Sequence, residues 1–243
     1  MKRILFAAIL SVATAGGAGA ADIAQPPPPE APGAYVPLVP PVYNWGGVYI
    51  GINGGWGWGD GKWSLPATVA FPALSGTVND NGAIIGGTLG VNYQTDAFVF
   101  GLEGDLDYSG INTDTTSTVC AVSGNCQTGN NWLSTVRARA GYASNNVLFY
   151  GTAGGAFANM QTTLSGVTTS HTQAGWTVGA GVEWAFYNNW TAKLEYLFVD
   201  LNTVNAACST AVCTANNGGA SVPFNVGLTE NLMRAGVNYK FNF

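Results

Sequence analysis

Residues 173–186, QAGWTVGAGVEWAF, decide the fold of this chain. Every second position in this stretch is apolar: Trp176, Val178, Ala180, Val182, Trp184 and Phe186. The positions between them hold mostly glycine and other small residues, with one carboxylate at Glu183. An apolar residue at every second position is typical of a β-strand. An apolar face that ends in tryptophans, opposite a small or polar face, indicates a strand of a membrane β-barrel.

Eight segments of this kind follow one another along the chain. They span residues 47–58, 83–93, 98–108, 132–142, 147–158, 173–186, 191–201 and 232–243. Seven of them have one clearly apolar face, whereas both faces of 147–158 are apolar or small. No run of 18 apolar residues is present, so the sequence predicts no transmembrane helix. We therefore predict an all-β fold, an eight-stranded antiparallel transmembrane up-and-down β-barrel.

The connections between these segments alternate in length. Short links at 94–97, 143–146 and 187–190 predict tight hairpins. The other links are long and polar, at 59–82, 109–131, 159–172 and 202–231. Short turns at one end and long loops at the other are typical of outer-membrane barrels. A soluble β-sandwich is the alternative, but a sandwich needs no outer band of aromatic residues.

The composition supports a surface that does not face water. Charged residues are 9% of the 243 residues, against about 25% in an ordinary soluble domain. Aromatic residues are 12%, which argues against a disordered chain. The formal net charge is −5 with only eight basic residues, so no nucleic-acid partner is expected.

The first 44 residues precede the predicted barrel. Residues 1–21 have a basic start at Lys2 and Arg3, a short apolar core and small residues at 18–20, which predicts a secretory signal peptide. Residues 22–44 hold eight of the eleven prolines and predict a stiff periplasmic linker. A ligand for a proline-binding module is the alternative for this segment. The barrel domain is then 45–243.

Charged residues within the strands fall on the face opposite the apolar one. This inward set holds five acids and five bases: Glu103, Asp105, Asp107, Arg137, Arg139, Glu183, Lys193, Glu195, Arg234 and Lys240. Unpaired charges in a water-poor interior are costly, and eight strands leave a lumen that side chains fill. Matched numbers therefore predict a salt-bridge network that plugs the barrel. A proton-transfer path or a gated ion path is the functional alternative.

Two further sets of residues follow from the pattern. An aromatic girdle is predicted at the ends of the outer face, from Trp56, Trp58, Trp132, Trp176, Trp184, Trp190, Tyr239 and Phe241. The cysteines lie in two long loops as Cys120 with Cys126 and Cys208 with Cys213, which favours a local disulfide within each loop among the three possible pairings. A zinc site is disfavoured because CxxC spacing is missing and His171, the only histidine, lies in another loop.

Enzyme chemistry has little support in the sequence. No G-x-S-x-G, P-loop or HExxH motif is present, and a serine-type barrel hydrolase needs a histidine on the barrel wall. Glu103, Asp105 and Asp107 share one strand face and could mimic a cation site, but pairing with the arginines of the next strand is simpler. We predict no catalytic residue, no cofactor and no metal.

Several short motifs resemble a known family. They are NWGGVYIG at 44–51, TVRARAGY at 135–142, GAGVEWA at 179–185, WTAKLEY at 190–196 and RAGVNYKF at 234–241. Together they resemble the small alphaproteobacterial outer-membrane surface-antigen family, which is similar to the OmpA-type eight-stranded barrel. The resemblance implies an envelope protein of a Gram-negative cell with no catalytic residues. The terminal Phe243 resembles the signal by which barrel-assembly machinery recognises its clients.

These observations predict an integral outer-membrane protein with a structural role in envelope integrity and a role as a surface antigen. The alternatives are a narrow-pore porin that passes small solutes or ions, and an adhesin or receptor that acts through its loops. The expected partners are outer-membrane lipid and lipopolysaccharide, the barrel-assembly machinery, and the cell wall through the proline-rich segment. The long loops are expected outside the cell and the linker in the periplasm.

Overall fold

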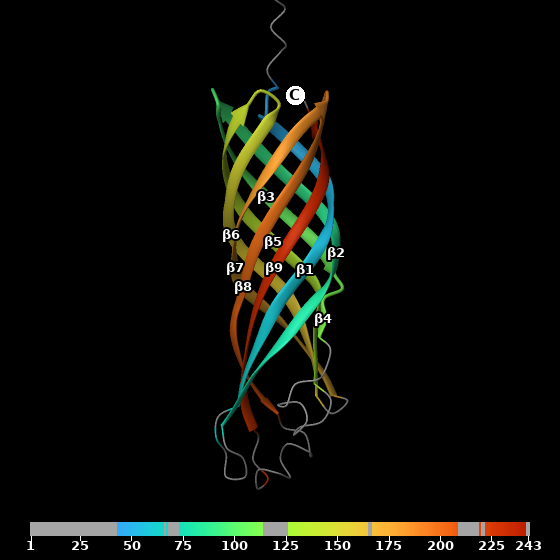
Figure 1. The fold of residues 1–243 in the computed structure, drawn as a ribbon, viewed down its shortest axis with the longest axis vertical. Helices are drawn as coiled ribbons and strands as arrows, with labels where there is room; N and C mark the ends of the chain where they lie inside the picture. The colour runs from blue at the N-terminus through green and yellow to red at the C-terminus, as the bar shows by residue number, and fades with distance from the viewer. Residues whose placement is uncertain are drawn as a thin grey trace, which may run out of the picture. The chain divides into compact units, whose positions relative to one another are not determined.

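The computed structural model describes residues 43–65, 67, 73–113, 126–164, 167–208, 219 and 222–241. Within these ranges the regular structure is entirely β (Figure 1). Eight long strands are β1 Gly47–Leu65, β2 Leu74–Thr95, β3 Phe98–Ser109, β5 Cys126–Ser144, β6 Val147–Leu164, β7 Val167–Tyr187, β8 Trp190–Cys208 and β9 Val222–Phe241. A two-residue strand, β4 Asn112–Thr113, follows β3. No helix in the described part is long and apolar enough to cross a membrane.

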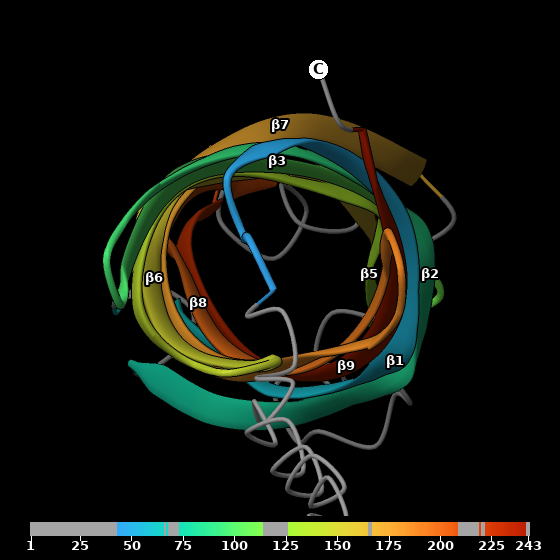
Figure 2. The same cartoon turned by 90° about the horizontal axis from the view of Figure 1, so that it is seen from above.

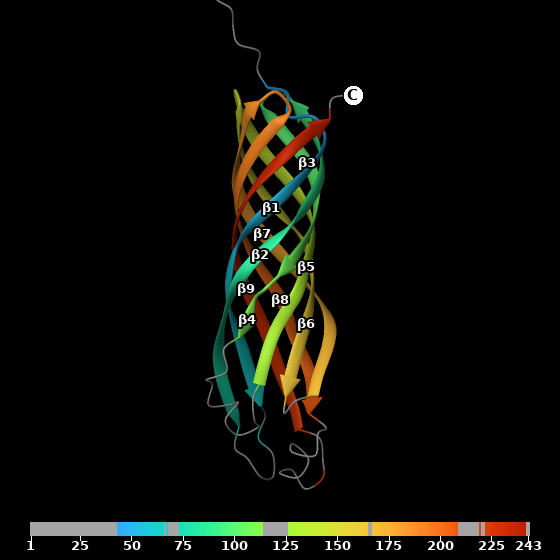
Figure 3. The same cartoon turned by 90° about the vertical axis from the view of Figure 1, so that its right-hand side faces the viewer.

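The strands form one closed antiparallel sheet. Each long strand pairs with the next long strand along the chain, and β1 pairs with both β2 and β9. Figure 2 shows the resulting ring, and Figures 1 and 3 show its tilted strands. Closure leaves no unpaired edge in lipid, where an unsatisfied backbone group is costly. The predicted eight-stranded transmembrane barrel is confirmed.

Three two-residue turns join β2 to β3, β5 to β6 and β7 to β8. Their first residues have positive φ angles: 51° at Asp96, 55° at Asn145 and 40° at Asn188. Aspartate and asparagine tolerate this left-handed conformation better than other residues with a side chain, so the sequence fits the turns. We call this end of the barrel the turn end, and the opposite end the loop end.

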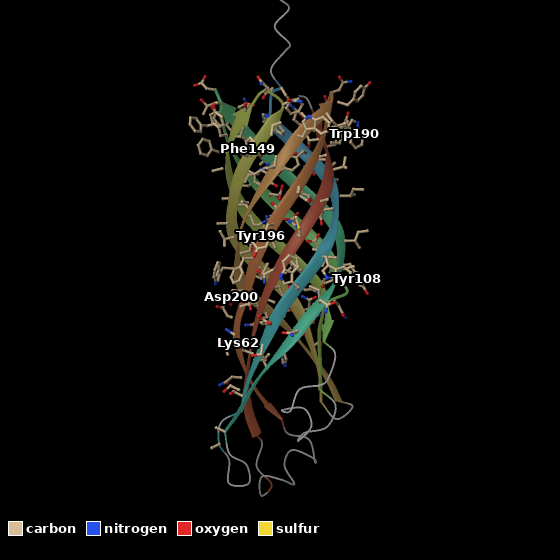
Figure 4. All side chains as sticks on the ribbon, in the orientation of Figure 1. Lys62, Tyr108, Phe149, Trp190, Tyr196 and Asp200 are labelled. Atoms are coloured by element: carbon tan, nitrogen blue, oxygen red, sulfur yellow. The ribbon has the colours of Figure 1, made fainter. Side chains whose placement is uncertain are left out.

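Most strands extend further toward the loop end than the sequence predicts. β1 continues to Leu65 and β2 already begins at Leu74, so much of the predicted loop 59–82 is a strand hairpin. The periodicity is hidden there because outward positions beyond Trp58 are polar, as at Asp60 and Lys62. In Figure 4, Lys62 lies further toward the loop end than the aromatic Tyr108. The barrel therefore continues as a polar-faced wall past its apolar band.

The outer face carries the apolar residues that the alternation predicts. Leu102 on β3, for example, is 59% exposed between two exposed aromatics, Phe100 and Tyr108. The structure also resolves the ambiguous fifth segment, because Phe149 faces outward whereas Leu148 and Tyr150 are buried in the lumen. Lipid replaces water as the partner of this outer band.

Two apolar clusters occupy the lumen. The turn-end cluster consists of Trp45, Val99, Ala143, Leu148, Tyr150 and Ala185. The loop-end cluster consists of Ile84, Ile111, Leu133, Ala156, Ala158, Leu197, Val199, Leu201, Val226, Leu228 and Leu232. Nine of the ten predicted charged residues lie between the two clusters along the strands, whereas Lys240 lies at the turn end and the buried Asp80 and Glu230 lie at the loop end. The interior is thus packed in three layers, apolar at both ends and ionic in the middle.

Candidate functional site: the charged lumen

The charged layer draws its side chains from five strands. Nine of the ten predicted residues are at most 3% exposed, and each takes part in an ion pair: Glu103, Asp105, Asp107, Arg137, Arg139, Glu183, Lys193, Glu195 and Arg234. Their positions alternate with outward apolar residues, so the strand period turns all of them into the lumen. We call these nine residues the lumen network.

Arg137 on β5 is one centre of the lumen network. Its Nη2 donates to Glu103 Oε1 and to Asp105 Oδ2, both at 2.5 Å, and its Nη1 donates to Glu195 Oε1 at 3.0 Å. Glu103 lies directly opposite Arg137 in the β3–β5 ladder. Glu195 comes instead from β8, across the lumen. One guanidinium therefore joins three carboxylates from two walls, a use of its forked donors that lysine cannot reproduce.

Arg234 on β9 is the second centre. Its Nη1 donates to Asp107 Oδ2 at 2.7 Å, and its Nη2 donates to Glu195 Oε2 at 2.5 Å. Glu195 is its neighbour in the β8–β9 ladder, whereas Asp107 belongs to β3 on the other side of the barrel. Since Asp105 and Glu195 each contact both Arg137 and Arg234, the two centres form one continuous network.

Arg139 and Lys193 extend the network toward the turn end. Arg139 Nη2 donates to Glu183 Oε2 at 2.7 Å, and its guanidinium carbon lies 4.0 Å from the centroid of the Tyr150 ring. Lys193 Nζ donates to Glu103 Oε1 at 3.2 Å across the lumen, although Glu183 is its neighbour in the β7–β8 ladder. Arg139 and Glu183 thereby connect the ionic layer to the aromatic side of the turn-end cluster.

The structure corrects the prediction for Lys240. This lysine is buried, but its Nζ donates to the backbone oxygen of Asn44 and lies 4.5 Å from the centroid of the Tyr43 ring. No ion pair to Lys240 is found among the described residues. It sits one residue before the end of β9, where the chain leading into β1 covers the mouth. The network therefore has five acids but only four bases, not the equal numbers expected from the sequence.

The excess negative charge is offset by neutral donors that the sequence reasoning missed. Tyr49 donates to Glu103 Oε2 at 2.7 Å, and Thr88 donates to Asp105 Oδ1 at the same distance. Further donors to the carboxylates are Thr135, Tyr150, Thr191 and Asn238. Their inward phase is readable from the sequence. Uncharged residues on that face, however, give no sign of which carboxylate they reach.

The turn-end mouth is covered by the residues that precede β1. Trp45 is 2% exposed, its backbone N–H donates to Gln94 Oε1 at 2.6 Å, and its ring packs edge-on against Tyr43 with centroids 4.8 Å apart. Burial, and to a lesser degree the Glu183 carboxylate, raise the pKa of Tyr43 to about 12. Tyr43 is therefore neutral at physiological pH, and its contact with Lys240 is a cation–π interaction.

The eight residues of the predicted girdle all lie on the outer face. Trp184, Trp190, Tyr239 and Phe241 lie toward the turn end, where the Trp190 and Tyr239 rings pack with centroids 5.1 Å apart. Trp56, Trp58, Trp132 and Trp176 lie further along the strands, and the Trp58 ring contacts that of Tyr196. Figure 4 shows Trp190 near the turn end and Tyr196 and Tyr108 further along the wall.

Other predicted residues lie partly or wholly outside the described part. Cys120, Cys213 and Phe243 are not described, and only the backbones of Cys126 and Cys208 are. The two disulfides and the assembly signal therefore stay predictions. His171 is an exposed residue of β7 rather than of a loop. Among the described residues, no group of three or more histidine, cysteine or acidic side chains is arranged to hold a metal ion.

The chemistry that this arrangement offers is neutralisation and cross-linking. Every carboxylate of the lumen network has a cationic partner, and the arginines tie opposite walls together. Breaking a buried pair of this kind by removing one partner costs far more than breaking an exposed one. In its geometry the site is therefore a cross-linked plug with an apolar cluster on each side of it along the strands.

Comparison with known proteins supports this architecture. A model of the outer membrane protein beta-barrel domain family matches residues 8–241. The 31 kDa outer-membrane immunogenic protein of Brucella melitensis biotype 1 is 32% identical over 99% of this chain and 100% of that protein. The 22 kDa outer membrane protein of Rhizobium leguminosarum bv. viciae is 32% identical over 84% of this chain and 81% of that protein.

Among solved structures, the outer membrane protein OprG from Pseudomonas aeruginosa is similar in fold. It matches with a TM-score of 0.52 and 12% identity, over 81% of this chain and 97% of that one. At this identity the likeness concerns the fold alone. The family match and the two relatives confirm the resemblance drawn from the strand motifs. The chain belongs to the outer membrane protein β-barrel domain family, among its alphaproteobacterial surface antigens, and its place is the outer membrane.

Proposed function

We propose that this protein is a closed structural barrel that stabilises the outer membrane and presents surface antigens. The observation that carries the proposal is that side chains fill the lumen. From the turn end to the loop end they form the turn-end cluster, the lumen network and the loop-end cluster. Trp45, Arg137 and Leu232, one from each layer, are at most 2% exposed. A solute would have to displace all three layers, so a structural role fits the interior better than transport does.

The cross-lumen ion pairs support a mechanical role. Arg137 links β5 to β8, and Arg234 links β9 to β3, so the walls are held together through the interior as well as through the sheet. Such links resist flattening of the barrel and raise the cost of local opening. A barrel of this kind acts in the envelope as a rigid integral membrane protein.

The antigen role rests on the relatives and on the connections between strands. The Brucella protein is named as immunogenic, and it aligns over nearly the whole of this chain. We propose that the long connections at the loop end face the outside of the cell and that the proline-rich segment lies in the periplasm. The position of Tyr43 at the turn end supports this orientation, because short turns face the periplasm in such barrels.

We propose outer-membrane lipid, lipopolysaccharide and the barrel-assembly machinery as partners, and the cell wall as a contact of residues 22–44. We also propose that the protein is not an enzyme, which fits relatives that are named as outer-membrane immunogenic proteins. The narrow-pore porin remains the competing function, because the middle of the lumen is polar.

Single-channel recording in planar bilayers tests the proposal directly. The folded full-length mature protein should give no steady openings in 1 M salt. Insertion is verified by protease protection of the barrel in the same lipid. Steady openings of the inserted wild-type protein would overturn the closed barrel and favour the porin.

A second measurement addresses the envelope. Cells that lack the protein should lose resistance to detergent and release periplasmic enzymes, and the wild-type gene should restore both properties. Unchanged detergent resistance and unchanged release in the deletion strain would contradict the stabilising role, whatever the bilayer recordings show.

A further inference from the structure

A hollow of about 790 Å³ lies at the turn end of the barrel. Tyr43 and Lys240, which lie at the mouth of the lumen, form part of its lining. Trp190 and Tyr239 of the predicted girdle form another part, and Figure 4 shows Trp190 near this end. The turn between β7 and β8 contributes Asn188. The hollow therefore joins the mouth of the lumen to the lipid-facing wall.

Lys240 brings a positive charge into this hollow. It is the only charged residue among the described residues of the lining. Its side chain is buried, and the partners of its ammonium group there are neutral, the backbone oxygen of Asn44 and the ring of Tyr43. A buried charge without an opposite charge is costly, and a lysine ammonium group has three donors to share. The hollow is therefore complementary to an anion.

The hydroxyl group of Tyr43 is a second donor at the mouth. It is buried, and it has no hydrogen-bond partner among the described residues. Because the pKa of Tyr43 is raised to about 12, the hydroxyl group keeps its proton at physiological pH. Buried polar atoms are rarely left unsatisfied. This hydroxyl group and the ammonium group of Lys240, which lies over the same ring, therefore indicate an acceptor from outside the barrel wall.

We propose that this hollow binds the phosphate group of a phospholipid. A phosphodiester carries a negative charge and several acceptor oxygens, so one group can accept hydrogen bonds from both Lys240 and Tyr43. Lysine binds phosphate in many proteins as a point charge. The acyl chains of the same lipid lie along the outer wall against Trp190 and Tyr239, whose rings pack with centroids 5.1 Å apart.

The aromatic girdle places a lipid headgroup at the level of the hollow. Tryptophan and tyrosine gather where the hydrocarbon of a membrane meets its headgroups. Tyr239 precedes Lys240 on β9, so the headgroups lie level with the lysine at the rim of the barrel. A soluble phosphate would meet the same two donors but would leave the aromatic side of the hollow without a partner. The site thus gives a specific place to the lipid partner proposed above, and the orientation proposed there assigns the lipid to the inner leaflet.

Native mass spectrometry of the folded full-length mature protein tests the proposal. The protein in detergent micelles is titrated with phosphatidylglycerol, and diacylglycerol with the same acyl chains is titrated in parallel. One phosphatidylglycerol should stay bound per chain, whereas diacylglycerol, which lacks the phosphate, should not. Lys240→Gln keeps a donor for the oxygen of Asn44 but removes the charge, and should weaken phosphatidylglycerol binding about tenfold or more.

Tyr43→Phe is the sharper variant because it removes a single oxygen atom. The ring beneath Lys240 remains, and the lost hydroxyl group has no partner in the described part of the protein. Without lipid, this variant should therefore unfold at the same urea concentration as the wild type. It should bind phosphatidylglycerol about threefold or more weakly. This variant decides the matter if Lys240→Gln does not fold.

Lys62→Gln is the matched control for the loss of charge. Lys62 is an exposed outward residue of β1 at the loop end, so its change should leave phosphatidylglycerol binding as it is in the wild type. Glycerol 3-phosphate is the control for a soluble ligand. It should bind far more weakly than phosphatidylglycerol, because it has no acyl chains to contact the girdle.

Wild-type affinity for phosphatidylglycerol in Lys240→Gln or in Tyr43→Phe would overturn the site. So would equal losses of affinity in Lys240→Gln and Lys62→Gln, because net charge alone would then retain the lipid. Equal affinity for glycerol 3-phosphate and phosphatidylglycerol would assign the hollow to a soluble phosphate and overturn the lipid. None of these outcomes depends on whether the barrel conducts or on its orientation, so the lipid site and the closed structural barrel fail separately.

Discussion

Arg137 on β5 and Glu195 on β8 lie on separate walls of the barrel, with β6 and β7 between them along the sheet, yet Arg137 Nη1 donates to Glu195 Oε1 at 3.0 Å. Both side chains are fully buried. The contact crosses the space through which any solute would move. The charge-assisted hydrogen bonds that cross the lumen are shorter and stronger than neutral ones, and they occupy the path that a solute would need.

Removing the Arg137 side chain should destabilise the barrel strongly. Arg137→Ala leaves Glu103, Asp105 and Glu195 with one cation fewer in a buried setting, and we expect a loss of about 3–5 kcal/mol. Urea titration of the barrel folded into lipid vesicles measures this loss. Adding Glu195→Gln to Arg137→Ala should recover part of it, because the double variant restores the net charge of the wild-type network.

Asp107 provides the control for that cycle. It contacts Arg234 and not Arg137, so Asp107→Asn should show much less coupling with Arg137→Ala than Glu195→Gln does. Purely additive losses for Arg137 with Glu103, Asp105 and Glu195 alike would contradict a salt-bridged lumen. A hydrated interior would then be the better description.

The sequence predicts the barrel well because lipid imposes a strict pattern. An outward residue such as Leu102 must be apolar and an inward residue such as Arg137 need not be, so alternation alone assigns both faces. The pattern fails where the constraint ends. Beyond Trp58 the outward positions are polar, and the strand continuing to Leu65 therefore looks like a loop.

The site is predictable in its members but not in its contacts. Strand phase places Glu195 and Arg137 in the lumen, but only the tilt and register of the sheet bring them to the same height. Lys240 shares that phase but lies nearer the turn end than the lumen network, and among the described residues it donates to the backbone oxygen of Asn44 instead of a carboxylate. The burial of Glu230 on β9 is not predicted, because the outward residues of its strand at that level are polar and the segment looks like a loop.

A charged side chain in the lipid-facing band should destabilise the barrel. Leu102 lies midway along the outer face of β3, so Leu102→Arg should cost about 2–4 kcal/mol in the folding titration in lipid vesicles. Asn79→Arg is the control, because Asn79 is an exposed outward residue of β2 beyond the apolar band and its change should cost little. Equal losses of stability for the two variants would contradict this assignment of the lipid-facing band.

The turn-end cluster should contribute stability without acting as the sole barrier. Trp45→Ala removes a large buried ring and should cost about 3–5 kcal/mol in urea titrations. Tyr187→Ala, at an exposed position beside the last turn, should cost much less. Because the lumen network and the loop-end cluster remain, Trp45→Ala should stay silent in planar bilayers. Steady openings in this variant would make Trp45 the barrier and leave the other two layers permeable.

Substitutions at two glycines of β2 distinguish the contribution of lumen packing to stability from that of strand propensity. Gly90 faces the lumen, and a Cβ there would overlap the ring and hydroxyl group of Tyr49. Tyr49 would have to move, which weakens its hydrogen bonds with Glu103 and Arg139, so Gly90→Ala should destabilise the barrel by about 1–3 kcal/mol. Gly87 faces outward, and a Cβ there would make only an ordinary contact, 3.7 Å from Gly51 O. Gly87→Ala should therefore be neutral or slightly stabilising in the same urea titration, since alanine restricts the unfolded chain more than glycine does. If both variants lose the same stability, the loss comes from the strand backbone. The close contact between Tyr49 and Gly90 then does not stabilise the lumen network.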